Sequence, residues 1–348
     1  MVLGKGIGID LGTTSVIIYV TGKGIVLNEP SVVALYTGYE KVVAIGSSAS
    51  EMVGKNPDSI TVIKPMNDGV ISDLSITDKM LRYYIQKICG NSIFKPRVVV
   101  CMPSTITSLE RRTILDAVTA AGAGSACLIE EPLAGAIGAG LDISKPYGTL
   151  VVDIGGGTTD VAVITMGSIA ISHSVKFAGN KFDQAIIKFV RNKKGIIIGE
   201  RTAEEIKKKI GCAVPRPVEI AINAKGKDYL SGMPKSFEIT SDEVYKALRY
   251  PLRKICDGIR EVLEDTPPEL AADIASQGVL VTGGGALLYG MADMIKKRTG
   301  VETVIADDPI NCVARGTGIA LQDSSILENN GYNFTSRDEI IGLYDEQW

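Results

Sequence analysis

The sequence has few of the residues on which metal centres, catalytic triads and disulfide frameworks depend. Its 348 residues include one histidine, His173, and six cysteines without any C-x-x-C spacing. His173 lies in a strand-like run with no carboxylate nearby in the sequence, so a structural role is expected for it. Widely spaced cysteines argue against a zinc knuckle and against a secreted disulfide framework. Any catalysis is therefore expected to use carboxylates, hydroxyls and backbone amides.

Long apolar runs and a strong net charge are also missing. No run approaches the roughly 18 residues that a membrane-spanning helix needs, and Met1–Lys5 is too short for a signal peptide. These features predict a cytosolic protein. The net charge is -3, from 37 basic and 40 acidic residues, so no general attraction to nucleic acid is expected. A G-x-x-x-x-G-K-[ST] sequence does not occur, which argues against P-loop chemistry.

A strand followed by a glycine-rich turn occurs twice. The first copy is Gly8–Ser15 (GIDLGTTS) and the second is Val152–Asp160 (VDIGGGTTD). In each copy an apolar strand delivers an aspartate, and the glycines let backbone N–H groups approach an anion. A third turn, Val281–Leu287 (VTGGGAL), leads into an expected helix, whose N-terminus suits a phosphate or nucleoside. Together the three turns predict a nucleoside triphosphate held between two similar halves.

Hydrophobic periodicity predicts the same α/β plan in both halves. We expect domain I at 1–147, with a small subdomain at about 34–66, and domain II at 148–322, with an inserted subdomain at about 180–250. Residues 323–348 carry six acidic side chains against one basic one, which predicts a solvated tail with some helix near 338–344. The expected strands are 7–10, 15–20, 24–27, 31–35, 42–45, 96–103, 149–153, 160–166, 168–174 and 278–282, and the expected helices are 48–52, 77–89, 108–121, 181–191, 201–210, 241–263 and 312–321.

These motifs resemble those of the actin-like ATPases, and within them the MreB/Mbl family of bacterial cytoskeletal proteins. Asp10–Thr13 is similar to the first phosphate motif of the family, Asp153–Thr159 to the second and Thr282–Leu287 to the adenosine motif. Glu130–Ala139 and Pro309–Gly318 resemble its two connecting helices. The resemblance implies duplicated actin-like (ribonuclease H-like) domains, each with a small inserted subdomain, around a nucleotide cleft.

The resemblance also implies ATP and Mg²⁺ as cofactors and a slow ATP hydrolysis coupled to polymerisation. Asp10 and Asp153 would hold Mg²⁺ through water, and Glu131 with Thr158 would orient the attacking water. Without the resemblance, Glu131 is equally an acid favoured by the dipole at a helix N-terminus. The nucleotide-binding residues that it implies are Gly12, Thr13, Thr14 and Ser15; Gly155, Gly156, Gly157 and Thr158; Glu204, Glu205, Ile206 and Lys207; and Gly284, Gly285, Ala286 and Leu287.

The partners implied by the resemblance are further copies of the chain and the inner face of the cell membrane. Family members form head-to-tail and antiparallel double filaments, organise cell-wall synthesis with a RodZ-type adaptor and cell-wall elongation proteins, and maintain rod shape. Ile93 and Phe94, in a loop between Lys87 and Lys95, are similar to a membrane-inserting apolar pair. Alternatively, Phe94 packs under its own loop. The expected location is the cytoplasm, at the inner face of the membrane, with no nucleic acid bound.

Two other functions on the same fold stay open at this point. A DnaK-type chaperone ATPase is favoured by Thr13–Ser15, although it would need a peptide-binding domain that this chain is too short to add. A small-molecule kinase would need a substrate pocket and a base directed at a substrate hydroxyl. ATP-dependent pelleting distinguishes a filament-forming protein from both.

Overall fold

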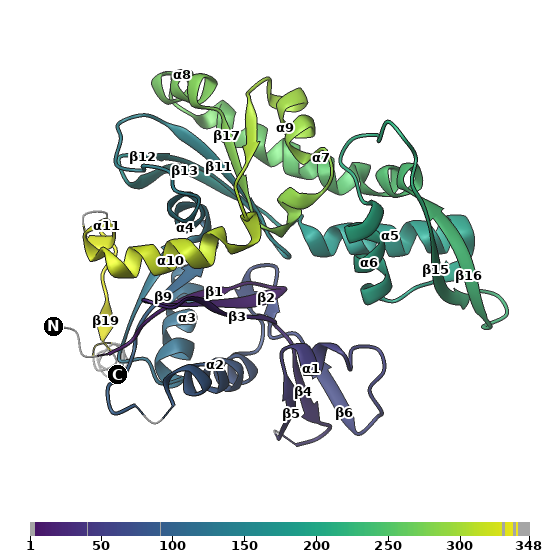
Figure 1. The fold of residues 1–348 in the computed structure, drawn as a ribbon, viewed down its shortest axis with the longest axis horizontal. Helices are drawn as coiled ribbons and strands as arrows, with labels where there is room; N and C mark the ends of the chain where they lie inside the picture. The colour runs from purple at the N-terminus through teal and green to yellow at the C-terminus, as the bar shows by residue number, and fades with distance from the viewer. Residues whose placement is uncertain (1–3, 40, 91, 329–330, 337–338, 340–348) are drawn as a thin grey trace.

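Two mixed β-sheets of the same design form the two halves of the molecule (Figure 1). The computed structural model describes residues 4–39, 41–90, 92–328, 331–336 and 339. The first sheet has the strand order β19-β10-β9-β1-β2-β3 and the second has the order β13-β12-β11-β17-β18. The strands of the first are β1 (Gly6–Leu11), β2 (Ser15–Val20), β3 (Gly24–Pro30), β9 (Arg97–Met102), β10 (Ser125–Glu130) and β19 (Thr335–Ser336), and those of the second are β11 (Thr149–Ile154), β12 (Thr159–Thr165), β13 (Ser168–Val175), β17 (Val279–Thr282) and β18 (Thr303–Ile305).

The internal duplication predicted from the glycine turns appears in the strand pairing. In the first sheet β1, β2 and β3 form an antiparallel meander. Strand β9 pairs with β1 in parallel, and β10 pairs with β9 in parallel. In the second sheet β11, β12 and β13 form the meander. Strand β17 pairs with β11 in parallel, and β18 pairs with β17 in parallel. The parallel strand β9 is a continuous apolar run, and Val98–Val100 are fully buried because such strands are covered on both faces.

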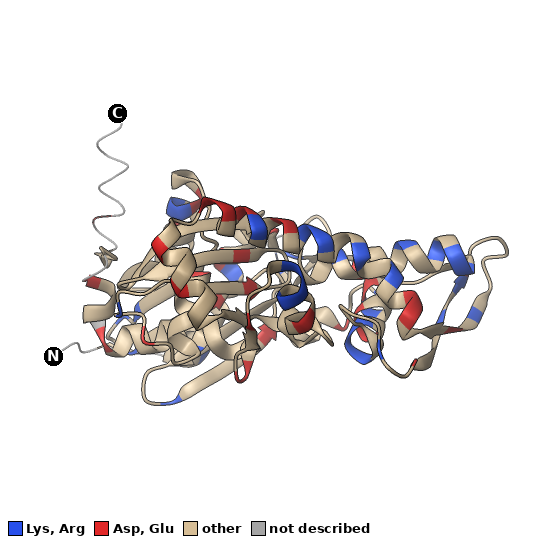
Figure 2. Ribbon diagram, turned by 90° about the horizontal axis from the view of Figure 1, so that it is seen from above, with Lys and Arg blue, Asp and Glu red and all other residues tan. Residues whose placement is uncertain are grey.

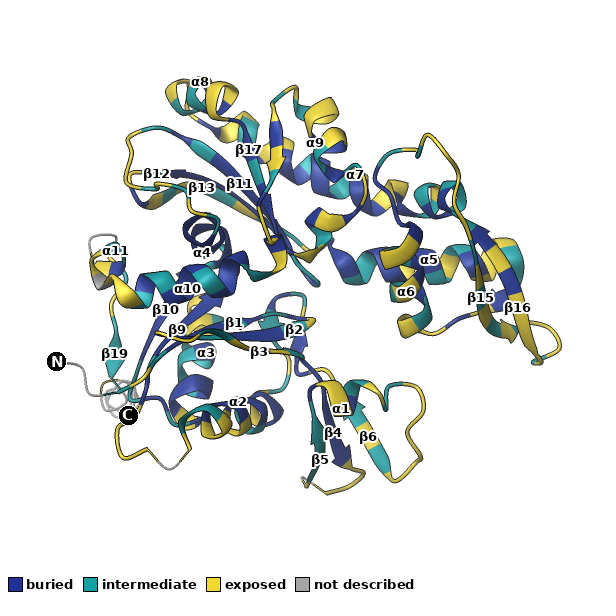
Figure 3. Cartoon of the chain, viewed as in Figure 1, coloured by how far each residue is buried: buried dark blue, intermediate teal, exposed yellow. Residues whose placement is uncertain are grey.

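Helices cover the outer faces of both sheets, and two more lie between the halves. Figure 3 shows the two central helices, α4 and α10, as largely buried. They cross at glycines, because a Cβ on Gly138 would lie 1.8 Å from the Cys312 carbonyl oxygen and one on Gly316 would lie 1.8 Å from that of Ala134. The helices are α2 (Leu74–Cys89), α3 (Ser108–Ala120), α4 (Glu131–Gly138), α5 (Gly179–Lys194), α7 (Ser241–Asp265), α8 (Pro268–Gln277), α9 (Met291–Thr299) and α10 (Cys312–Gln322).

Each half also carries a smaller sheet at its outer end. The sheet β5-β4-β6, with β4 (Val33–Tyr36), β5 (Val42–Ile45), β6 (Ile60–Ile63) and the short helix α1 (Ser47–Ser50), lies in the stretch predicted as the first small subdomain. The sheet β14-β15-β16, with β14 (Ile196–Ile197), β15 (Ala221–Asp228), β16 (Pro234–Thr240) and the helix α6 (Glu200–Ile210), lies in the second. A short hairpin, β7 (Met66–Asn67) and β8 (Val70–Ile71), follows β6. The domain bounds themselves remain predictions.

Basic and acidic residues are both spread along the chain over the two halves, as the ribbon in Figure 2 shows. Among the described residues, no helix combines the length and the apolar character that a membrane crossing requires.

The prediction of a solvated tail after residue 322 is wrong for the described residues 323–328 and 331–336, which pack onto the first half. This segment forms α11 (Ser324–Glu328) and β19, which packs against the first sheet, and the side chain of Leu327 is fully buried. The acidic composition hid a run of spaced apolar side chains that reach the core. Of the helix predicted near 338–344, all but Glu339 lies outside the described residues.

His173 has a carboxylate neighbour that its local sequence does not show. Its Nε2 atom lies 3.3 Å from Oε2 of Glu261, which is on α7 and far away in the sequence. The pair forms because α7 packs across β13, a contact that local sequence cannot show. Both side chains are about half exposed, so the pair lies at the surface and not in a buried catalytic site.

Candidate active site

Four carboxyl groups, three of them buried and that of Asp10 partly buried, come together where the two halves meet. They are Asp10 at the end of β1, Glu131 at the start of α4, Asp153 in β11 and Asp160 in β12. Asp153 and Asp160 are direct partners in the antiparallel register, and the negative charges that act on Glu131 are those of the other three. We call these four residues the carboxylate cluster. Asp160 was quoted in the second motif but was not predicted as a site residue, because its convergence depends on the pairing of β11 with β12.

Burial raises the pKa of every member of the carboxylate cluster. For Asp10 the pKa rises to about 6, partly offset by a hydrogen bond from Cys101 Sγ at 3.3 Å. For Asp153 the pKa rises to about 7, although Thr282 Oγ1 donates to Oδ1 at 2.6 Å and lowers it, while Asp10 and Asp160 add to the rise. For Glu131 burial and the other three carboxylates move the pKa far upward. Such a site favours a cation that offsets the repulsion.

The cluster suits an ion that keeps its own water. Within the residues that the structure describes, no three histidine, cysteine or acidic side chains are arranged to bind a metal directly. Asp10 and Asp153 nevertheless present carboxylates from opposite halves, and the negative charges of Asp10 and Asp160 act on Asp153. Mg²⁺ binds oxygen ligands and usually retains several waters, so the residues fit a hydrated magnesium ion held between them.

The two glycine-rich turns have the same local structure and touch each other. In both, the first glycine donates to the carbonyl three residues later: Gly12 N to Ser15 O at 3.0 Å and Gly155 N to Thr158 O at 2.9 Å. A Cβ on Gly156 would lie 1.7 Å from Thr14 Oγ1. Gly156 is therefore required by the contact between the halves as well as by any approach of an anion.

Thr13 and its neighbour Gly157 extend this contact. A Cβ on Gly157 would lie 2.4 Å from Thr13 Oγ1, and the same oxygen accepts a hydrogen bond from Gly69 N at 2.9 Å. Thr158 is buried beside Gly69, since a Cβ on Gly69 would lie 2.9 Å from Thr158 Cγ2. The structure thus places Thr13 and Thr158 close together where the glycine turns of the two halves touch. Whether Thr158 pairs with Glu131 around a water remains a prediction.

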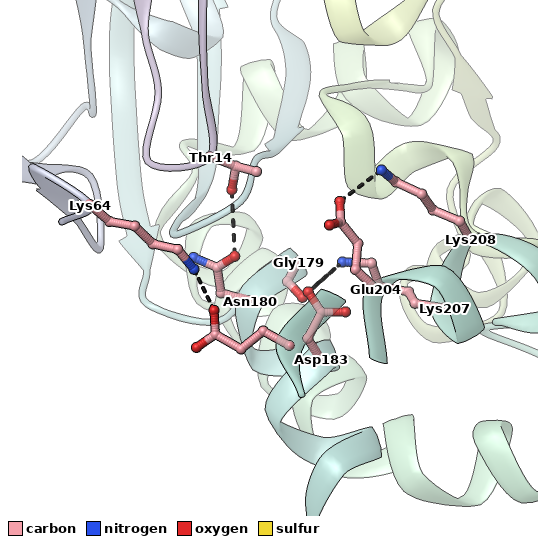
Figure 4. A network of polar contacts seen from close by, with 9 residues as sticks. Thr14, Lys64, Gly179, Asn180, Asp183, Glu204, Lys207 and Lys208 are labelled. Atoms are coloured by element: carbon pink, nitrogen blue, oxygen red, sulfur yellow. Dashed lines mark hydrogen bonds and ion pairs between the residues drawn. The ribbon is translucent and has the colours of Figure 1, made fainter. Parts of the chain in front are cut away.

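A polar network links the second turn to α6 (Figure 4). The backbone N–H groups of Gly179 and Asn180, at the start of α5, donate to the carbonyls of Gly155 and Gly156. Lys207 Nζ binds Asp183 Oδ2 at 2.8 Å and the Gly179 carbonyl at 3.2 Å. Burial raises the pKa of Asp183 to about 6, and Lys207 opposes that rise. Asp183 and Asn180 were not predicted as site residues, because the sequence around them reads only as an amphipathic helix.

The four residues predicted on α6 do not lie in equivalent environments. The side chain of Ile206 is buried in the core of the second half and does not face the cleft. Glu204 pairs with Lys208 at 2.7 Å, and Glu205 pairs with Arg201 at 3.3 Å, both on the helix surface. Of the predicted set, Lys207 is joined most directly to the glycine turn.

The third turn packs against the end of β11. It forms a short 3-10 helix, η1 (Gly284–Leu287), entered through Gly283 with φ at +81°. A Cβ on Gly285 would lie 2.2 Å from Ile154 Cγ2, so glycine is needed for this approach. Ala286 is buried in the core, whereas Leu287 is 59% exposed. The exposed part of the turn therefore offers the Leu287 side chain for contact.

Two contacts span the opening between the halves (Figure 4). Lys64, after β6, forms an ion pair with Glu200 of α6 at 2.5 Å, and Thr14 Oγ1 lies 3.4 Å from Asn180 Oδ1. A groove of about 610 Å³ lies beside the ion pair and is lined by Thr37, Val53, Gly54, Asn56, Asp58, Ile60, Thr61, Val62, Lys64 and Glu200. The outer ends of the two halves thus meet across the opening.

The predicted membrane pair lies at the surface, away from the cleft. Ile93 is 92% exposed and Phe94 is 50% exposed. Their loop follows α2, and Ser92 Oγ donates to the Phe94 carbonyl at 3.1 Å. Half of the Phe94 ring is thus covered, while Ile93 has almost no covering contact.

Comparison with known proteins places this arrangement in a family. The family model described as MreB/Mbl protein matches residues 4–329. The chain is 47% identical to the cell shape-determining protein Mbl of Bacillus subtilis, over 93% of this chain and 97% of that protein. It is 48% identical to the cell shape-determining protein MreB of Escherichia coli K12, over 91% of this chain and 93% of that protein.

Solved structures give the same result for the fold. MreB5 of Spiroplasma citri bound to ADP has a TM-score of 0.90 and 39% identity, covering 95% of this chain and all of that one. The same protein bound to AMPPNP has a TM-score of 0.89 and 39% identity, covering 94% and 99%. The predicted family and the predicted α/β actin-like fold are confirmed, and the chain belongs to the MreB/Mbl family.

Proposed function

We propose that this chain is a filament-forming actin-like ATPase that determines cell shape by organising cell-wall synthesis. The observation that carries the proposal is the buried carboxylate cluster, which lies where two matching glycine turns touch. Buried acids that repel one another, beside backbone donors at two turns, suit a nucleoside triphosphate with its magnesium ion. The names of the Mbl and MreB relatives support the role in cell shape, and the ADP and AMPPNP of the Spiroplasma citri structures support the ligand class.

In this mechanism the chain mainly positions the nucleotide, its ion and the attacking water, and it offsets the negative charge of the phosphates. Mg²⁺, when bound with the nucleotide, would offset the negative charge of the phosphates. Asp10 and Asp153 would hold its water ligands from the two halves, and backbone N–H groups of the two turns would donate to phosphate oxygens. Glu131, at the start of α4, would accept a hydrogen bond from the attacking water and hold it in line, with Thr158 as its partner.

Nucleotide binding would also set the relative angle of the two halves. Three contacts join one half to the other: that between the glycine turns, the Lys64–Glu200 ion pair and the contact of Thr14 with Asn180. A ligand between the two halves would therefore favour a single closed arrangement. A fixed shape lets copies stack head to tail into open filaments, because the operation that relates them does not close into a ring. We propose antiparallel pairs of such filaments at the inner face of the membrane, with a RodZ-type adaptor and cell-wall elongation proteins as partners.

Filament formation is tested by pelleting with Mg·ATP. We expect the protein to sediment and to scatter light with Mg·ATP, to stay in the supernatant with EDTA, and to show filaments by negative-stain microscopy. Asp10→Ala, which removes one holder of the ion, is the matched variant and is expected to need at least tenfold more Mg·ATP, because one charge-assisted contact is lost. A protein that binds Mg·ATP tightly and never sediments would support the chaperone or the kinase instead.

Membrane attachment is expected to depend on Ile93 and Phe94. Burial of these two side chains in lipid contributes only a few kcal/mol for each subunit, so filaments should bind far more strongly than monomers. Ile93→Ser combined with Phe94→Ser is expected to abolish co-sedimentation of filaments with liposomes while leaving lipid-free pelleting intact. The control is Leu230→Ser with Met233→Ser, which removes two exposed apolar residues from a different loop. Undiminished liposome binding by the first variant would remove the loop from the anchor.

A further inference from the structure

The segment after α10 runs back along β10 as an added edge strand. Ser336 and Thr335 pair with Ser125 and Ala126 at the beginning of β10. Leu327 is fully buried in the cluster that also contains Ile129. The Arg97 guanidinium stacks on the Phe334 ring at 3.9 Å. Apolar, cationic and backbone contacts thus fasten this segment to the outer edge of the first sheet.

Near the far end of β10 the same segment contacts a charged side chain. Tyr332 Oη donates a hydrogen bond of 2.5 Å to Oε2 of Glu130, and Arg111 of α3 lies 3.6 Å from Oε1 of that carboxylate. Burial raises the pKa of Tyr332, and the Glu130 carboxylate raises it further, so the phenol remains a donor at neutral pH. Glu130 is therefore held from two sides, and Tyr332 provides the shorter contact.

Glu130 is the residue at which β10 becomes α4. It is the last residue of the strand and the N-cap residue of the helix, with extended backbone angles, and its side chain makes no capping bond. The next residue is Glu131, which enters the carboxylate cluster from the first position of α4. Any displacement of the Glu130 backbone is passed on directly to Glu131.

We propose that Tyr332 is a positioning residue for Glu131, acting through Glu130. This inference rests on the proposed function, in which Glu131 orients the attacking water. Removing the Tyr332 hydroxyl leaves Glu130 with the longer contact to Arg111, and the strand-to-helix junction gains freedom. Small displacements of a positioned group lower the rate of a reaction much more than the affinity for its ligand. The segment beyond α10 thus becomes part of the hydrolytic apparatus of this chain.

The test compares two single-hydroxyl variants of the full chain. Tyr332→Phe is expected to lower kcat for ATP hydrolysis about fivefold, as befits one hydrogen bond, with KM for Mg·ATP and the melting temperature nearly unchanged. The matched control is Tyr19→Phe, which removes the hydroxyl that accepts from Gln322 Nε2 at 3.1 Å, near the root of the same segment. The control should keep the parental kcat.

A double-mutant cycle identifies the route of the effect. If Tyr332 acts through Glu130, the drop in kcat caused by Tyr332→Phe should disappear when the substitution is made in Glu130→Ala. Parental kcat in Tyr332→Phe, or equal losses in Tyr332→Phe and Tyr19→Phe, overturns the inference. Glu131→Ala separates the proposed mechanism from the positioning role of Tyr332. If Glu131→Ala stops ATP hydrolysis while Tyr332→Phe does not slow it, only the positioning role fails. If Glu131→Ala hydrolyses ATP normally, the proposed mechanism fails and the positioning role fails with it.

Discussion

Glu131→Ala is expected to bind Mg·ATP with the affinity of the parent and to hydrolyse it at least about a hundredfold more slowly. A side chain that positions or deprotonates a reacting water typically contributes 10² to 10⁴ in rate. Binding should survive because the two glycine turns and both aspartates remain, and because the substitution removes one of four carboxylates that repel each other. Phosphate release under single turnover, measured beside nucleotide titration, separates the two effects.

The matched control for this experiment is Glu269→Ala. Glu269 is also an acid in the first turn of a helix, α8, but it is exposed and has no place in the cleft. If Glu131 served only the helix dipole, both variants would lose a similar fraction of stability, about 0.3–1 kcal/mol, and neither would lose turnover. Parental turnover in Glu131→Ala would therefore assign the side chain to helix stability alone.

Asp153→Asn is expected to be more stable than the parent at pH 8 in buffer without metal or nucleotide. Burial raises the pKa of Asp153 from 3.8 to about 7, so the folded state holds this proton more tightly than the unfolded chain. The parent therefore loses stability as the pH rises from about 4 to 7 and does not regain it above. Each pKa unit corresponds to about 1.4 kcal/mol, which sets the gain at up to about 4 kcal/mol.

Urea melts between pH 4 and pH 8 measure this difference, which should vanish near pH 4. Asparagine keeps an oxygen for the hydrogen bond from Thr282 and removes only the charge. With Mg·ATP the order should reverse, because the variant lacks a carboxylate for the ion. Asp228→Asn is the control with the opposite sign: hydrogen bonds from the Ser231 backbone, Lys235 and the Ser231 side chain lower the pKa of that partly exposed carboxyl, so its removal should not stabilise the protein at pH 8. Equal melts for Asp153→Asn and the parent would contradict the prediction.

The sequence predicted the elements whose signal is local. The strand Ser15–Val20 has the predicted bounds, and Ser108–Ala120 differs by one residue at its end, since a capping box at Thr107 and Glu110 fixes its start. The glycine turns were found because their function and their close approach both require glycine. Patterns of this kind are written in consecutive residues, and such residues can be interpreted without knowledge of the fold.

Features that depend on distant partners were missed. Asp160 joins the carboxylate cluster through strand pairing, and Asp183 enters the site through Lys207 on another helix. Ile206 was included by its motif although the helix turns it into the core. The acidic composition of the last residues concealed Leu327 and Tyr332, whose burial requires the edge of a sheet formed much earlier in the chain. Composition averages over a segment, whereas burial is decided residue by residue.

The crossing of α4 and α10 determines how one half can turn against the other. At Gly138 and Gly316 the main chains lie directly against each other, and the Arg315 side chain donates to the Gly138 carbonyl beside this contact. Because the glycines let the helices approach main chain to main chain, a rotation about this point disturbs fewer large side chains than one about a crossing of bulky residues would. Bulky side chains in place of Gly138 and Gly316 would lock α4 against α10. The angle between the two halves would then no longer change with a ligand bound between them.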